Sequence, residues 1–139
     1  MIRGYTAGVY DMFHIGHLNL LKRAKSLCDY LIVGVSTDEV VLKNKNKMAI
    51  IPYHDRAAIV AAIKYVDKVI PQNGYDVKEK IKIAKEMNID IMFVGSDWKD
   101  TEKWKIIESE LKKINVKVIY LQHTDGISST ILREKIKGC

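Results

Sequence analysis

The chain has 139 residues, of which 47% are hydrophobic and 29% charged, a balance that fits one compact domain and excludes intrinsic disorder. It contains no apolar run of about 20 residues, which excludes a membrane-spanning helix, and its first residues lack the layout of a signal peptide, so we expect a cytoplasmic protein. Lysine and arginine number 23 against 17 acidic residues, and this surplus favours a phosphate-rich partner: a nucleotide, a phosphorylated metabolite or nucleic acid.

Short β-branched runs alternate with amphipathic stretches along the whole chain. Strands separated by helices in this way predict an α/β fold: a single Rossmann-like domain over residues 1–139, with a five-stranded parallel sheet and helices on both faces. The predicted strands, in chain order, are Tyr5–Val9, Tyr30–Val35, Val66–Ile70, Ile91–Gly95 and Val116–Leu121, and Pro71 is expected to end the third of them. The predicted helices are Leu18–Cys28, a helix that begins at Pro52, Val77–Met87, Glu102–Ile114 and Ser128–Lys137. In the helix that begins at Pro52, one side carries Ala58, Ile59, Ala62 and Ile63.

In such a fold, ligands bind at the carboxyl ends of the strands, so the turn after the first predicted strand is the first candidate site. Gly8 leaves room there for a ligand to approach the backbone. His14 and His17 lie where this turn enters a helix, whose free N–H groups and dipole already favour an anion. Two imidazole donors would stabilise the extra charge of a pentacoordinate phosphorus transition state. The alternatives are a helix cap with a packing residue, and a zinc site, which two histidines without further nearby ligands fit poorly.

A second polar segment follows the last predicted strand and leads into the last predicted helix. Three hydroxyls at a helix start cap its free N–H groups and also suit phosphate oxygens, and for Ser128 alone capping is the simpler interpretation. The segment reads His123, Thr124, Asp125, Gly126, Ile127, Ser128, Ser129, Thr130.

A lysine-rich segment follows the second predicted strand. Lys43, Lys45 and Lys47 alternate with uncharged residues, so we expect one extended face to carry three positive charges. Cations there would offset the repulsion between two phosphorylated substrates. A solvated basic loop is the alternative.

Taken together, these motifs resemble the cytidylyltransferase family of the nucleotidyltransferase superfamily, which also contains the class I aminoacyl-tRNA synthetases. His14-Ile15-Gly16-His17, preceded by Gly8 and Asp11, is similar to the first signature of the family. The segment 126–130 is similar to the second, which runs Arg-Thr-Glu-Gly-Ile-Ser-Thr-Thr in the small glycerol-3-phosphate enzymes. The similarity covers nearly the whole chain, and the chain length also matches these short bacterial enzymes.

The resemblance implies a role for individual residues. His14 and His17 would contact the triphosphate and assist at phosphorus. The residues implied in catalysis are His14, His17, Lys47, Ser128 and Ser129. The residues implied in nucleotide binding are Gly8, Val9, Tyr10, His14, His17, Lys47, Asp97, His123, Thr124, Gly126, Ile127, Ser128, Ser129 and Thr130. The residues implied in acceptor binding are Lys45, Lys78, Arg56 and Asp11.

Two positions depart from the family pattern. Val9 stands where the glycerol-phosphate enzymes usually carry threonine, which removes a hydroxyl and keeps the backbone N–H. His123 stands where an arginine is usual, and histidine lacks the bidentate, always-charged fork of arginine. Nucleotide choice is therefore left open.

The implied reaction is direct in-line attack of sn-glycerol 3-phosphate on the α-phosphate of CTP, giving CDP-glycerol and pyrophosphate for teichoic acid or capsule synthesis. Mg²⁺ is expected as a cofactor held mainly by the triphosphate, with no metal site built by the protein. The resemblance also implies a homodimer with its interface near residues 64–67. The alternatives are an ethanolamine-phosphate or choline-phosphate cytidylyltransferase, an adenylyltransferase for a sugar phosphate, and a catalytically silent RNA-binding domain, which the absence of an aromatic and basic stacking surface disfavours.

Overall fold

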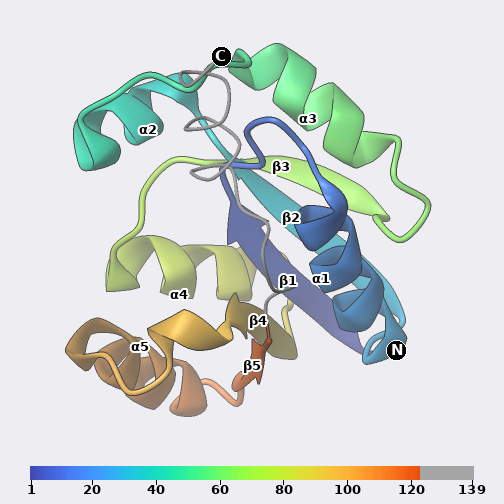
Figure 1. The fold of residues 1–139 in the computed structure, drawn as a ribbon. Coiled ribbons are helices and arrows are strands. Elements are labelled where there is room, and N and C mark those ends of the chain that lie inside the picture. The colour runs from blue at the N-terminus through green and yellow to red at the C-terminus, as the bar shows by residue number, and fades with distance from the viewer. Residues whose placement is uncertain (123–139) are drawn as a thin grey trace.

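A computed structural model of the chain describes residues 1–122, and within this range five strands form one parallel sheet in the order β3-β2-β1-β4-β5 (Figure 1). This confirms the predicted fold class. In chain order the elements are β1 (Arg3–Gly8), α1 (Ile15–Ser26), β2 (Tyr30–Ser36), α2 (Asp38–Lys45), α3 (Tyr53–Ala61), β3 (Lys68–Gln72), α4 (Val77–Glu86), β4 (Ile91–Gly95), the 3₁₀ turn η1 (Ser96–Trp98), α5 (Glu102–Lys112) and β5 (Lys117–Leu121).

The sheet divides the core into two layers because successive side chains of each strand point to opposite faces. On β2, Ile32 packs with the buried side of α4 and α5, whereas Leu31 and Val33 pack with α1 and α3. Figure 1 shows α4 and α5 on one side of the sheet and α1 and α3 on the other. The β-branched runs are buried on both faces, as the sequence predicts.

β1 lies in the middle of the sheet, paired with β2 on one side and β4 on the other. The chain builds outward from β1 to β2 and β3, then crosses back to β4 and β5. The strand order therefore reverses between β1 and β4, where this class of sheet binds its ligands. The carboxyl ends of these two strands are therefore the place where a ligand is expected.

The lysine-rich segment is helical, which makes the prediction of an extended basic face wrong. Thr37 caps α2 by accepting a hydrogen bond from the Val40 N–H, and Asp38 and Glu39 in the first turn complement the helix dipole. The uncharged residues between the lysines mask this signal, because alternation over a few residues imitates a strand. Lys43 and Lys45 therefore lie in the last turn of α2, and Lys47 follows the helix.

Two further predictions are wrong: one concerns the side of α3 that faces the core, and the other concerns the end of β3. The inward side of α3 carries Arg56 and Val60, whereas Ile59 is 43% exposed. Pro71 does not end β3, which continues to Gln72. A proline is tolerated here because β3 is an edge strand and needs no ladder donor on its open side. The last predicted helix, at Ser128–Lys137, lies outside the described residues.

Among the helices of the described range, none combines the length and apolar character that a membrane crossing requires.

Gly34 on β2 gives the fold a testable weak point. A Cβ added to Gly34 would overlap the hydroxyl of Tyr5, which is 1% exposed and has no room to move. We expect Gly34→Ala to lower the free energy of unfolding by about 1–3 kcal/mol, measured by urea denaturation. Gly74→Ala is the matched control, because its Cβ would lie 3.8 Å from Glu79, and it should leave stability nearly unchanged.

Adding Tyr5→Phe to Gly34→Ala removes the overlapping hydroxyl and should recover part of the loss. Equal stability of Gly34→Ala and the wild type would contradict this account of the packing.

Candidate active site

The turn between β1 and α1 is strained and packed. Tyr10 and Met12 adopt the left-handed conformation, with φ of 55° and 48°. The Tyr10 ring is 5% exposed, lies against Gly8 and makes an edge contact with the His17 ring at 5.4 Å between centroids. Left-handed non-glycine residues cost free energy, and they persist where contacts with the surrounding structure hold them in place.

His14 and His17 form a reciprocal cap on the first turn of α1. The Nδ1 atom of His14 accepts a hydrogen bond from the Gly16 N–H at 3.0 Å, and the Nδ1 atom of His17 accepts one from the His14 N–H at 3.2 Å. The two rings stack, with centroids 3.9 Å apart. The arrangement is a capping box made of two imidazoles, so the cap and the proposed catalytic pair are the same residues.

This cap fixes the protons of both imidazoles. Each Nδ1 accepts a backbone hydrogen bond and is therefore unprotonated, so a neutral ring carries its proton on Nε2. Burial lowers the pKa of His14. Burial and the neighbouring His14 lower the pKa of His17 to about 4, although Asp11 acts to raise it. At neutral pH the pair thus presents two Nε2–H donors. The His14 Nε2 atom is buried and has no hydrogen-bond partner among the described residues.

Arg56 and Asp11 hold the turn in place through buried hydrogen bonds to the backbone. Arg56 is 1% exposed, and its guanidinium donates to the carbonyl oxygens of Val9, Ser36 and Ile51 and to the Asp38 carboxylate. Asp11 is 2% exposed and accepts hydrogen bonds from the N–H groups of Ile50 and Ile51. Both groups therefore bind the segment before α3 to the turn after β1.

A cavity of about 470 Å³ opens at the carboxyl ends of β1 and β4. Of the residues predicted to bind the nucleotide or the acceptor, Gly8, Val9 and Lys45 line it, whereas Tyr10, Asp11, His14, His17 and Arg56 do not. Its remaining wall is formed by the following residues: Tyr5, Ala7, Asn44, Gln72, Tyr75, Lys80, Met92, Phe93, Val94, Gly95, Trp98, Lys103 and Trp104. Among the described residues that line the cavity, three are lysines and none is acidic.

The other predicted site residues fall into three groups. Asp97 lies in η1, between the lining residues Gly95 and Trp98. Lys47 and Lys78 are exposed and are not part of the cavity wall. His123, Thr124, Gly126, Ile127, Ser128, Ser129 and Thr130 lie outside the described residues.

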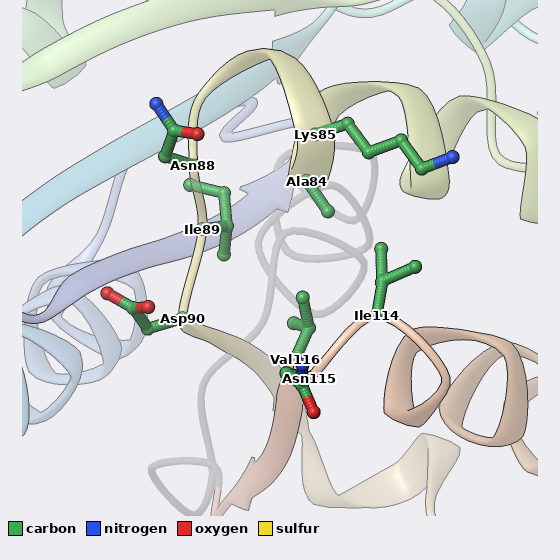
Figure 2. Close-up of a pocket in the computed structure, with 8 residues that line it drawn as sticks. All are labelled: Ala84, Lys85, Asn88, Ile89, Asp90, Ile114, Asn115 and Val116. Carbon is green, nitrogen blue, oxygen red and sulfur yellow. The ribbon is translucent and has the colours of Figure 1, made fainter.

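A second hollow, of about 350 Å³, lies at the opposite end of the sheet, where the chain enters β4 and β5 (Figure 2). Its floor is apolar, with Ala84, Ile89 and Val116, and Figure 2 shows Asn88 and Asp90 on the side opposite Lys85. The Asp90 carboxylate accepts a hydrogen bond from the Arg3 N–H. This hollow is remote from the strand ends that bind ligands, so we give it no part in the site.

The family model described as cytidylyltransferase-like matches residues 5–135. The chain belongs to the cytidylyltransferase-like family. It is 41% identical over 133 residues to a glycerol-3-phosphate cytidylyltransferase of Bacillus subtilis (strain 168), covering 96% of this chain and 95% of that protein.

Proteins with other activities in their names are also similar to this chain. An FAD synthase of Pyrococcus abyssi is 37% identical over 117 residues, covering 84% of this chain and 76% of that protein. A solved structure, described as the lipopolysaccharide core biosynthesis protein of Thermoplasma volcanium, matches with a TM-score of 0.70 and 31% identity over 89% of this chain and 97% of that chain. This cytidylyltransferase-like protein is therefore a nucleotidyltransferase.

Sequence reasoning missed Lys80 and Lys103 as cavity residues. Lys80 is 7% exposed and occupies the inward side of α4 with Ile83 and Ala84. The signal was present, because positions 80, 83 and 84 share one helical face and a lysine among apolar neighbours interrupts it. The motif of the family directed attention to Lys78 instead.

The lowered pKa of His17 predicts a loss of stability in acid. Between pH 6.5, the ordinary pKa of histidine, and about pH 4, His17 binds a proton in the unfolded chain but stays neutral in the folded chain. The free energy of unfolding therefore falls as the pH falls through this range. Urea denaturation at about pH 7 and about pH 4.5 should show a loss in the wild type that exceeds the loss in His17→Gln by about 2 kcal/mol. The control is His54→Gln, at a fully accessible position on α3, which should follow the wild type. Identical acid profiles of His17→Gln and the wild type would contradict the buried, neutral imidazole.

Proposed function

We propose that this protein transfers the cytidylyl group of CTP to sn-glycerol 3-phosphate, releasing pyrophosphate and forming CDP-glycerol. The observation that carries the choice of acceptor is the cavity at the carboxyl ends of β1 and β4, which has three lysines and no acidic residue among the described residues that line it. A wall of this charge favours an acceptor whose only charge is its phosphate. Choline phosphate and ethanolamine phosphate carry a cation, which an acidic side chain or an aromatic ring face would bind. Two of the aromatic rings in this wall, Trp104 and Tyr75, are already contacted by Lys80 and Lys103.

The reaction needs no covalent enzyme intermediate. A phosphate oxygen of the acceptor, already ionised at neutral pH, attacks the α-phosphorus in line, and the bond to the bridging oxygen of pyrophosphate breaks opposite to it. No general base is required for this step. The protein contributes position and charge: the Nε2–H donors of His14 and His17 and the N terminus of α1 stabilise the charge that develops on the phosphate oxygens.

The substrates are expected to meet along β1. In this proposal the nucleotide lies over the backbone of Val9 and Tyr10, its phosphates reach α1, and the acceptor occupies the lysine-lined part of the cavity. Lys45 binds the acceptor phosphate and Lys47 the nucleotide phosphates. Residues 123–130 and Asp97 complete the nucleotide site, as the family motifs imply. Lys78, which is exposed and outside the cavity wall, is proposed as a second contact to the acceptor phosphate on the family resemblance alone. Arg56 and Asp11 act through the backbone they hold, because their hydrogen bonds are made to the turn and to the segment before α3.

Mg²⁺ is proposed to arrive with CTP and to be held mainly by the triphosphate. Among residues 1–122, no group of three or more histidine, cysteine, aspartate or glutamate side chains is placed to hold a metal ion. Both oxygens of Asp11 already accept backbone hydrogen bonds. Bound Mg²⁺ supplies charge neutralisation on the phosphates.

We further propose that the protein acts in the cytoplasm as a homodimer and supplies CDP-glycerol for a teichoic acid or capsular polymer. Exposed apolar side chains on and between α2 and α3 support self-association: Leu42, Met48, Ile50 and Ile59 are between 43% and 70% exposed. Asp67, in the predicted interface near residues 64–67, bonds within its own chain to Lys25 and the Leu31 N–H.

A panel assay tests the reaction directly. Pyrophosphate release is measured with each of the four nucleoside triphosphates and with sn-glycerol 3-phosphate, ethanolamine phosphate, choline phosphate and a sugar phosphate. We expect CTP with glycerol phosphate to exceed every other pair in kcat/KM by at least about 100-fold. A higher kcat/KM with ATP, or with an amino-alcohol phosphate, would contradict the proposed substrates.

Asparagine variants separate capping from catalysis at the histidine pair. Asparagine supplies an acceptor near the position of Nδ1, which keeps the cap, but has no donor at the position of Nε2. We expect His14→Asn and His17→Asn to melt within a few degrees of the wild type and to lose about 100- to 1,000-fold in kcat.

Full activity of both asparagine variants would show that the histidines are only helix caps. His54→Asn, on the exposed side of α3, is the control for loss of an imidazole as such and should keep wild-type kcat.

A further inference from the structure

The strands and the helices supply different chemistry to the cavity wall. Its three lysines come from helices: Lys45 from α2, Lys80 from α4 and Lys103 from α5. Of the described residues that line the cavity, those in strands are all uncharged, and only Tyr5 of β1 and Gln72 of β3 carry a polar group on the side chain. The sheet side of the cavity therefore suits an uncharged polar part of a ligand.

The Tyr5 side chain reaches from β1 across β2, in the direction of β3. Its hydroxyl lies over Gly34, where a Cβ would overlap it, so the glycine leaves the space that this ring needs. Burial raises the pKa of Tyr5, and its hydroxyl therefore stays protonated. Within residues 1–122 this hydroxyl makes no hydrogen bond, and Tyr5 lines the cavity. A buried phenol normally has a hydrogen-bond partner, and a group bound in the cavity would supply one.

The Gln72 carboxamide is held in one orientation by a chain of hydroxyl groups. The Tyr75 hydroxyl donates to Ser36 Oγ at 2.9 Å, and Ser36 Oγ donates to Gln72 Oε1 at 2.8 Å. Ser36 is fully buried and Gln72 is 3% exposed. The Gln72 Nε2 group carries two N–H donors and has no hydrogen-bond partner in the described part of the chain. Gln72 lines the cavity, so these donors are available to a ligand there.

The two groups lean onto β2 from opposite sides. Tyr5 lies over Gly34, and Gln72 bonds to Ser36, two residues further along β2. Residues two apart on a strand share a face, with about 7 Å between them. A small polyol with a hydrogen bond at each end can span this distance, so one ligand can contact both groups.

We propose that the Tyr5 hydroxyl and the Gln72 carboxamide bind the hydroxyl groups of the acceptor and thereby select a phosphorylated polyol. This rests on the proposed nucleotidyl transfer to a phosphorylated alcohol. Tyr5 donates and accepts, Gln72 donates, and an alcohol hydroxyl does both, so the pairing satisfies every group. An acceptor without the hydroxyl would leave buried polar groups unpaired, which is a strong basis for discrimination.

Deoxy acceptors combined with single-residue variants test this assignment. In 3-hydroxypropyl phosphate the central hydroxyl of glycerol 3-phosphate is missing, and in 2-hydroxypropyl phosphate the terminal one is missing. For the wild type, kcat/KM should be about 5- to 50-fold lower with at least one analogue than with glycerol 3-phosphate. Tyr5→Phe and Gln72→Met should each lower kcat/KM for glycerol 3-phosphate by a similar factor, with the KM for CTP within about twofold of the wild type. With the analogue that lacks the hydroxyl bound by the replaced group, variant and wild type should agree within about twofold, because that interaction is already absent.

Two controls separate hydroxyl binding from a loss of structure. Tyr5→Phe removes only one oxygen, and in Gln72→Met the Ser36 hydroxyl can donate to the Gly8 carbonyl oxygen, 3.3 Å away, so both variants should melt within a few degrees of the wild type. Asn73→Leu is the matched control, because Asn73 is exposed beside Gln72 and outside the cavity wall. It should leave the ratios of kcat/KM between the acceptors unchanged.

If either folded variant keeps the wild-type ratios of kcat/KM between glycerol 3-phosphate and both analogues, the inference is overturned and the proposed reaction stands. Equal use of all three acceptors by the wild type would overturn the inference in the same way. Absence of pyrophosphate release by the wild type with every acceptor would instead overturn the proposed function itself.

Discussion

The site depends on two backbone N–H groups that each donate to the Nδ1 atom of a histidine. These bonds, from Gly16 to His14 and from His14 to His17, are ordinary capping interactions at the start of α1. Their chemical consequence is that both imidazoles become neutral donors at Nε2, because a ring that accepts at Nδ1 carries its proton on the other nitrogen. Burial reinforces the neutral state. The interaction that stabilises this helix end thus also leaves two donors, which the proposed function assigns to phosphate oxygens.

The turn that carries these histidines is held by charges that are themselves buried. Arg56 connects the end of β1 to the end of β2 through the carbonyl oxygens of Val9 and Ser36, and Asp11 fixes the segment before α3. Removing either group would leave buried polar atoms without partners, so both act on the site through the backbone. Rigid support of this kind is what catalysis by positioning requires, since small displacements of a donor cost much of its effect.

The sequence predicted the sheet, its five strands and the first turn, because β-branched runs and the histidine spacing are local signals that tertiary contacts do not override. It failed for α2, where alternating lysines concealed a helix capped by Thr37. It also placed the wrong side of α3 inward, since a buried arginine at position 56 contradicts hydrophobic patterning and is explained only by the carbonyl groups gathered around it. Lys80 was missed for the same reason: a buried cation becomes interpretable only once the cavity beside it is known.

The proposed chemistry depends on the protonation state of two imidazole rings, and heteronuclear NMR of the imidazole nitrogens reports that state without any assay of activity. With ¹⁵N-labelled histidine at neutral pH, the signals of His14 and His17 should show a bare Nδ1 and a protonated Nε2, and His17 should gain its second proton only near the pKa of about 4. Addition of CTP should shift both Nε2–H resonances while the Nδ1 signals stay unprotonated. A proton on Nδ1 of either ring, or a charged imidazole at neutral pH, would contradict the paired-donor account.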